Sequence, residues 1–162
     1  MPFELTPENA ARFSRDASAV VRSYIEAQNS LFKFSFMRAL GLKKPDPEKA
    51  AAAAAPLLDK VKAMLEEVRE LKLDADKPLD AFFMTMRPYL RSLEDAMSYF
   101  IALCRKINTA QHDESSRYWK DQYKADLLEH QRKEQEYLKI GLDLTERWKA
   151  LTAEKTPQTA AK

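Results

Sequence analysis

One apolar series runs through the middle of this chain without a break and dictates its secondary structure. Between residues 79 and 107, apolar side chains recur at alternating intervals of four and three residues. That interval places them all on one face of an α-helix, whereas a strand would require a period of two. The series consists of Leu79, Phe83, Met86, Leu90, Leu93, Met97, Phe100, Cys104 and Ile107. We therefore expect a long helix that must bury this face, with a bend at Pro88.

A second pattern of this kind opens the chain. Thr6, Pro7 and Glu8 form a helix-start signal, because threonine caps a helix, proline suits its first turn and an acid favours its positive end. The phenylalanines of LFKFSFMRALGLKK, residues 31–44, alternate as in a strand. The stretch before them in which apolar residues recur at helical intervals covers far more of the chain. We therefore expect one helix that stops at Gly41. Its apolar positions are Phe13, Ala17, Val20, Tyr24, Ala27, Leu31 and Phe34.

The next helical pattern is less regular. Asp46, Pro47 and Glu48 repeat the start signal, and a run of alanines follows. Pro56 then must kink the helix or mark a fresh start, because proline lacks the amide hydrogen and clashes with the preceding turn. A helix over residues 56–73 would be shorter than its partners and would leave part of a groove uncovered, unless the alanine run fills it. Its apolar positions are Leu57, Val61, Met64, Val68 and Leu71.

The remaining helix completes a familiar architecture. Asp113 is the expected cap of a fourth helix that runs to about Leu151. We expect residues 1–153 to form a single domain and residues 154–162 to be a disordered tail. The chain has only two glycines and is rich in helix-forming residues. Together these features predict an all-α protein, an antiparallel four-helix bundle with long helices 1, 3 and 4 and a shorter, proline-kinked helix 2.

Charge and cysteine content exclude several classes of function. The formal net charge is +2, with acidic and basic residues interspersed, whereas a nucleic-acid-binding surface needs a basic face. The single cysteine, Cys104, excludes a disulfide framework within one chain and suits a reducing compartment. No run of about twenty apolar residues could span a bilayer, and the first residues show no signal-peptide pattern. We expect a cytoplasmic protein that does not bind nucleic acid.

The fourth helical pattern contains a polar gap. The segment EHQRKEQE, residues 129–136, has no apolar residue, and His130 and Glu134 share one face there at a spacing of four. A metal or acid–base site is one interpretation, but a carboxylate-bridged di-metal site needs a Glu-x-x-His motif on each of two helices. We therefore predict a hydrogen-bonded polar layer at His130 and Glu134, with no metal, no cofactor and no catalytic residue. His112 is expected to be a turn residue, and Cys104 a buried apolar one.

Two segments carry apolar side chains on more sides than one bundle can cover. Phe32, Phe36 and Met37 spread around the end of the first helix, and Phe82 and Met84 lie off the main series of the third. A second subunit, another protein or lipid could cover them. These five residues are the candidate interface.

The preferred function is therefore a non-catalytic helical bundle that acts through protein–protein interaction, as a homo-oligomer, adaptor, chaperone or regulator. The alternative is a protein whose amphipathic helices bind a membrane or the surface of a hydrophobic granule, as phasins and exchangeable apolipoproteins do, a likeness of class only. An enzyme or metal protein with a polar site in the bundle ranks third, because the sequence has no catalytic motif.

Overall fold

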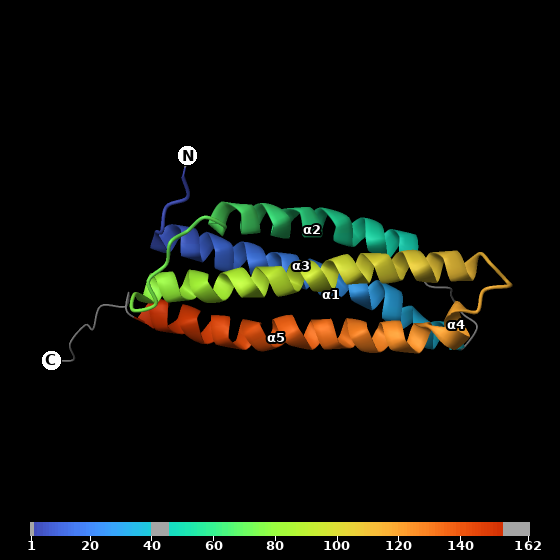
Figure 1. The fold of residues 1–162 in the computed structure, drawn as a ribbon. Helices are drawn as coiled ribbons and strands as arrows, with labels where there is room; N and C mark the ends of the chain where they lie inside the picture. Colours follow the sequence, from blue (N-terminus) through green and yellow to red (C-terminus); the bar gives the residue numbers. More distant parts are fainter. Residues whose placement is uncertain (1, 40–45, 154–162) are drawn as a thin grey trace.

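The computed structural model describes residues 2–39 and 46–153, and the side chains of these residues except 33–39. Four long helices lie along a common axis, with α4 a short helix at one end (Figure 1). Successive long helices pack antiparallel, and the described residues contain no strand. The predicted all-α antiparallel four-helix bundle is confirmed. The helices are α1 (Pro7–Ala39), α2 (Pro47–Val68), α3 (Pro78–Gln111), α4 (Tyr118–Asp121) and α5 (Tyr123–Ala153).

The two predicted start signals form helix caps. The Thr6 hydroxyl oxygen accepts a hydrogen bond of 3.1 Å from the backbone amide of Asn9 at the start of α1. The Asp46 carboxylate accepts one of 3.0 Å from the amide of Lys49 at the start of α2. Each cap pairs an amide that has no partner within the helix.

Helix α2 is shorter than the other three long helices, as predicted, and of the two alternatives at Pro56 the one with a single helix through the proline is observed. The alanine run belongs to α2, with Pro56 inside the helix, and α2 ends at Val68 rather than near residue 73. Ala50 and Ala54 are buried and extend the apolar series of α2 toward its start at the same alternating spacing. Arg87 of α3 then closes the other end, because its guanidinium donates hydrogen bonds to the backbone carbonyls of Val68 and Leu71.

The boundary between the third and fourth helices also differs from the prediction. Helix α3 ends at Gln111, and α5 begins only at Tyr123, after the short α4. Asp113 does not cap a helix, because its carboxylate accepts hydrogen bonds from the amide and the hydroxyl of Ser115 and closes a local turn. His112 ends α3, in keeping with its predicted place in a turn.

Helix α3 is the centre of the bundle. Its predicted apolar series is buried at every position except Leu79, which is half-buried. At the beginning of α3, Phe83 meets Phe3, Phe13 and Phe82 edge to face, with ring centroids 5.2–5.6 Å apart. Because α1, α2 and α5 all pack against it, α3 buries a wider face than its apolar series alone.

Helix α1 changes neighbours along its length (Figure 1). Near its start, Arg12 forms an ion pair of 2.6 Å with Glu67 of α2. Further along, Gln28 donates a hydrogen bond of 3.1 Å to Glu134 of α5. Over the described residues, the backbone of α1 packs closely on α2 and α3 but not on α5. The space between α1 and α5 is therefore the least closed part of the bundle.

Candidate functional site

Two pockets lie between α1 and α5. The first, which we call the glutamate pocket, has a volume of about 350 Å³. Its lining residues are Gln28, Phe32, Tyr123, Leu127, His130, Gln131 and Glu134. The second, the serine pocket, has a volume of about 340 Å³. Its lining residues are Ser14, Ala17, Ser18, Phe82, Tyr89, Gly141, Leu144, Thr145 and Trp148. Both volumes fall in the range of about 300–1,000 Å³ that is typical of small-molecule sites.

Exposed apolar side chains occupy the surface between the two pockets. Ile25 lies seven residues from both Ser18 and Phe32, and Leu138 lies seven residues from both Gln131 and Thr145. Helical spacing therefore places Ile25 and Leu138 on the flanks that line the pockets, with Leu142 one turn beyond Leu138. Their exposed fractions are 42% for Ile25, 51% for Leu138 and 72% for Leu142. We call this surface the α1–α5 face, formed by Ser18, Ile25, Phe32, Gln131, Leu138, Leu142 and Thr145.

Beneath this face, a layer of hydrogen bonds joins the helices. The hydroxyl of Tyr24 lies 2.7 Å from Oε1 of Glu134 and 3.3 Å from the backbone oxygen of Ala96 in α3. Oε2 of Glu134 accepts hydrogen bonds from Gln28 at 3.1 Å and from Tyr137 at 2.5 Å. The structure thus places the predicted polar residue Glu134 at the centre of a network that connects α1, α3 and α5.

The two tyrosines of this layer remain hydrogen-bond donors. Burial first, and then the negative charge of Glu134, raise the pKa of Tyr24 far above its ordinary value. Burial and the hydrogen bond to Glu134 raise the pKa of Tyr137 in the same way. Both hydroxyls therefore stay protonated at neutral pH and donate to the Glu134 carboxylate.

His130 is a buried, neutral member of the layer. Its ring lies between Phe32 and Phe100, with centroid distances of 5.5 and 5.6 Å, and its side chain is 3% exposed. Because the Gln28 amide nitrogen donates to Glu134, the Gln28 oxygen is left to accept from Nε2 of His130 at 3.2 Å. Nδ1 is buried and has no hydrogen-bond partner in the part of the chain that the structure describes. Burial lowers the pKa of His130 below its ordinary value of 6.5, and Glu134 opposes this only in part.

We expect His130 to make the protein less stable in mild acid. Unfolded His130 binds a proton as the pH falls through 6.5, whereas folded His130 resists protonation until a lower pH, so stability present above pH 6.5 is lost below it. The free energy of unfolding, measured by urea denaturation, should fall between pH 7.5 and pH 5.5. The free energy of unfolding of His130→Phe should fall less over this pH range, because phenylalanine fits between the neighbouring aromatic rings and does not titrate.

His112→Gln is the matched control, because His112 is exposed at the end of α3. Between pH 7.5 and pH 5.5, the free energy of unfolding of this variant should fall by as much as that of the unaltered protein. An equal fall in His130→Phe would show that His130 does not cause it.

The candidate interface residues are found in different environments. Phe32 is half-buried and packs on Phe100 and His130. Phe82 is fully buried between Phe83 and Trp148, so the apolar surface expected at Phe82 is absent. Met84 is 45% exposed. Phe36 and Met37 lie outside the residues whose side chains are described.

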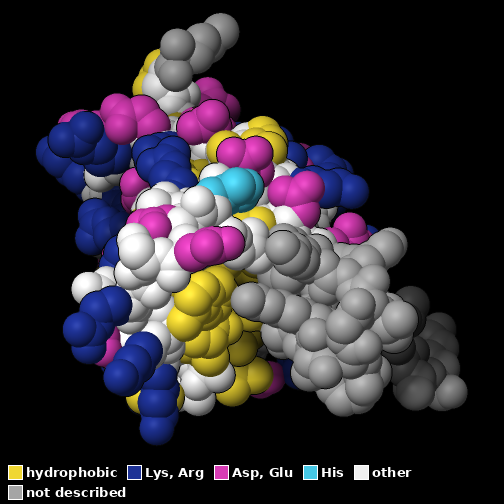
Figure 2. Space-filling view, turned by 90° about the vertical axis from the view of Figure 1, so that its right-hand side faces the viewer, with side chains coloured by type: hydrophobic (Ala, Val, Ile, Leu, Met, Phe, Trp, Pro, Cys, Tyr) yellow, Lys and Arg dark blue, Asp and Glu magenta, His cyan; other side chains and the backbone are white. Residues whose placement is uncertain are grey.

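Three exposed apolar residues of the α1–α5 face were not predicted from the sequence. These residues, Ile25, Leu138 and Leu142, do not belong to the apolar series of their helices. Their helical spacing therefore predicts that they are exposed. The signal that could have identified Ile25 and Leu138 is their spacing of seven from residues on the same flank, and Leu142 follows Leu138 by four. The half-buried rings of Tyr118, Trp119 and Tyr123 stack edge to face at the α4 end. Hydrophobic side chains are visible on that end in Figure 2.

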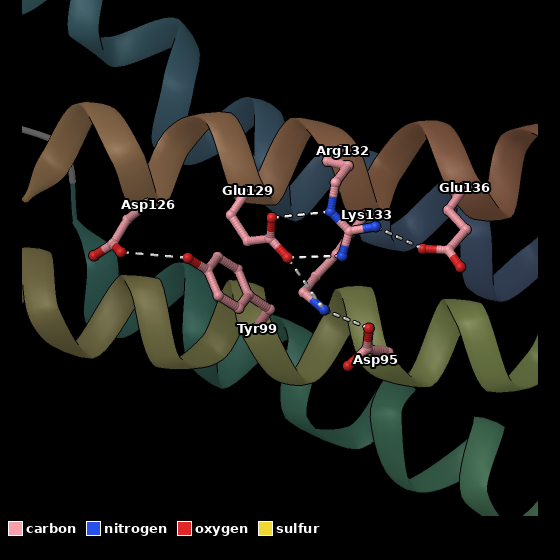
Figure 3. Close-up of polar contacts among 7 residues, drawn as sticks. All are labelled: Asp95, Tyr99, Asp126, Glu129, Arg132, Lys133 and Glu136. Atoms are coloured by element: carbon pink, nitrogen blue, oxygen red, sulfur yellow. Dashed lines mark hydrogen bonds and ion pairs between the residues drawn. The ribbon is translucent and has the colours of Figure 1, made fainter.

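The opposite flank of α5 is bound to α3 by charged and polar side chains (Figure 3). Lys133 bridges Asp95 of α3 at 2.5 Å and Glu129 of its own helix at 3.7 Å. Arg132 contacts Glu129 and Glu136 on the outer surface of α5. Asp126 accepts hydrogen bonds from Tyr99, Lys106 and Tyr118. Helix α5 is thus held to α3 by these charged and polar contacts, and its contacts with α1 include those of the hydrogen-bonded layer between the two pockets.

The described residues offer little reactive chemistry. Cys104 is buried, and burial raises the pKa of its thiol to about 12, so the thiolate nucleophile does not form at neutral pH. Within this part of the chain, no group of three or more histidine, cysteine, aspartate or glutamate side chains is placed to hold a metal ion. None of its helices is both long enough and apolar enough to cross a bilayer.

Comparison with protein-family models, with curated proteins and with solved structures gave no match to this chain.

Proposed function

We propose that this protein is a non-catalytic helical bundle that acts by binding another protein or a second copy of itself at the α1–α5 face. The observation that carries the proposal is the exposure of Ile25, Leu138 and Leu142 next to two pockets. Exposed apolar side chains that adjoin hollows are typical of protein-binding surfaces, because an anchor side chain of the partner can fill a pocket and exclude water.

The shape of this surface favours a helical partner. Helices α1 and α5 run antiparallel on either side of it, and their backbones do not pack closely. A partner helix laid along the face would place side chains at intervals of three, four and seven residues over the two pockets. It would also cover the exposed leucines, as a helix does in a bundle.

The alternative function, binding to a membrane or a hydrophobic granule, also uses exposed apolar side chains. Leu128 and Met84, which are 57% and 45% exposed, lie outside the α1–α5 face. A protein that inserts into lipid could use all of these positions, whereas a protein-binding face should depend on its own residues alone. This difference allows the two proposals to be separated.

The experiment is photo-crosslinking from single positions in the native cell. A photoreactive amino acid at Leu142 should crosslink to one defined protein, and Leu138→Glu should abolish the adduct, because it places a charge at the centre of a desolvated contact. Mass spectrometry of the adduct identifies the partner or a second copy. Sedimentation over a range of concentrations then measures the association and its loss in Leu138→Glu.

Met84→Glu is the matched control, because Met84 is a partly exposed apolar residue outside the α1–α5 face. It should leave both the adduct and the association unchanged. If Met84→Glu abolishes the adduct and Leu138→Glu does not, the proposed face is wrong. Flotation with phosphatidylcholine–phosphatidylglycerol vesicles in place of a protein adduct would favour the lipid-binding alternative.

A further inference from the structure

The Glu134 carboxylate has an acceptor position that no donor among the described residues uses. Oε1 accepts from Tyr24, and Oε2 accepts from Gln28 and Tyr137. A carboxylate offers about four acceptor positions, so one position on Oε1 remains. The Glu134 side chain is 16% exposed and lines the glutamate pocket, so a ligand in that pocket can reach it.

The negative charge of Glu134 also lacks a cationic partner among the described residues. Among the residues whose side chains are described, the only basic group within 4 Å is Nε2 of His130, at 3.9 Å, and that imidazole is neutral at pH 7 because burial lowers its pKa. The neighbouring cations of α5 have other partners. Lys133 pairs with Asp95 and Glu129, and Arg132 pairs with Glu129 and Glu136. A bound cation would therefore gain an interaction that the described residues do not already satisfy.

The walls of the glutamate pocket suit the apolar part of such a ligand. Phe32, Tyr123 and Leu127 line it with two rings and one aliphatic side chain. Aromatic rings attract an ammonium group through their negative faces and cover the methylene groups attached to it. The side-chain amide of Gln131 also lines the pocket and provides a carbonyl oxygen.

We propose that the glutamate pocket binds an alkylammonium group, with the Glu134 carboxylate as the acceptor and the ring of Tyr123 along the alkyl stem. The group belongs either to a free aliphatic amine or to a lysine side chain of another protein. This proposal does not depend on the proposed function, because the pocket can take an amine whether or not the α1–α5 face binds a protein.

The first test is a titration of the full chain with butylammonium, which matches the end of a lysine side chain. Binding is measured by calorimetry and by the NMR signals of the Gln28 and Gln131 side-chain amides. Butylammonium should bind and shift both amides, and neutral 1-butanol at equal concentration should not. Glu134→Gln should weaken the binding about tenfold or more, as the loss of a hydrogen bond to a charged group predicts.

Glu136→Gln is the matched control, because Glu136 lies on the outer surface of α5 beside Arg132. It should bind butylammonium as the unaltered protein does. Equal binding of 1-butanol, no binding of butylammonium, or full binding by Glu134→Gln would each overturn the proposal. The comparison of butylammonium with 1-butanol uses the unaltered protein, so the test holds even if Glu134→Gln folds poorly.

Two further ligands separate the sources of the ammonium group. Cadaverine represents a free amine, and a helical peptide with one lysine flanked by leucines represents a protein. Tighter binding of the peptide than of its norleucine counterpart, lost in Glu134→Gln, assigns the pocket to a lysine side chain. Tighter binding of cadaverine than of the peptide assigns it to a free amine. If the ammonium ligands bind but crosslinking at Leu142 finds no partner, the proposed function fails and the pocket stands.

Discussion

Phe83→Ala should lower the free energy of unfolding by about 3–5 kcal/mol, because truncation of a buried phenylalanine loses its transfer free energy and leaves a cavity. Phe83 is fully buried and meets the rings of Phe3, Phe13 and Phe82. These rings come from the N-terminal segment, α1 and α3, so neighbouring side chains cannot all move to fill the space. Urea denaturation monitored by circular dichroism measures the loss.

The control is the next residue along the chain. Met84 is 45% exposed, and Met84→Ala should change the free energy of unfolding by about 0.5 kcal/mol or less. The two variants differ in burial, and neither change introduces a helix-breaking residue. Equal losses in Phe83→Ala and Met84→Ala would mean that α3 is rotated or shifted relative to the structure described above.

These neighbouring residues also mark the limit of what the spacing of apolar residues predicts. Phe83 belongs to the alternating series, and its burial follows from the sequence. Phe82 lies outside the series, yet it is buried between Phe83 and Trp148. A single apolar series identifies one face of a helix, whereas α3 is covered by three neighbours. Which helix occupies the centre depends on the packing of the whole bundle, and the series in one helix does not contain that information.

The helix ends were predictable where a cap is local and unpredictable where a distant residue acts. Thr6 and Asp46 pair with amides three residues away, so their sequence signals were sufficient. Helix α2 ends at Val68, whose backbone carbonyl accepts a hydrogen bond from the guanidinium of Arg87. No spacing pattern in the sequence relates Val68 to Arg87, so this helix end could not be predicted. An aspartate such as Asp113 tends to accept hydrogen bonds from nearby backbone amides, as in a helix cap. Here its carboxylate accepts them from the amide and hydroxyl of Ser115 in a turn, and it does not cap a helix.

The polar layer was half predictable. The gap between residues 129 and 136 identified His130 and Glu134, because their spacing of four puts them on one helical face. Tyr24 and Tyr137 looked like members of apolar series. Tyr137 lies three residues from Glu134 in α5, so its hydrogen bond is local, whereas only the register between α1 and α5 brings the Tyr24 hydroxyl to Glu134. That register joins residues more than one hundred positions apart in the chain, so no local pattern carries it.

Glu134→Ala should be the second most damaging change, with a loss of about 2–4 kcal/mol in the free energy of unfolding. The substitution removes one acceptor that three donors share. It leaves the buried hydroxyl of Tyr137 without its acceptor and that of Tyr24 with only the longer contact, 3.3 Å, to the backbone oxygen of Ala96. Each buried donor left unsatisfied costs about 1–3 kcal/mol. Gln28 faces the pocket and can turn to water, so its loss adds little. Urea denaturation at pH 7.5 measures the change.

Two comparisons test whether the loss of stability comes from the hydrogen-bond network and not simply from the removal of a glutamate. Glu136→Ala removes a carboxylate two residues away whose partner, Arg132, is exposed, and it should have little effect on stability. In the Tyr24→Phe background, Glu134→Ala should lower the free energy of unfolding less than it does alone. One of the two hydroxyls that lose the Glu134 carboxylate is then already absent. Losses that simply add in the double variant would show that Tyr24 and Glu134 stabilise the bundle independently, and the layer would not then join α1 to α5.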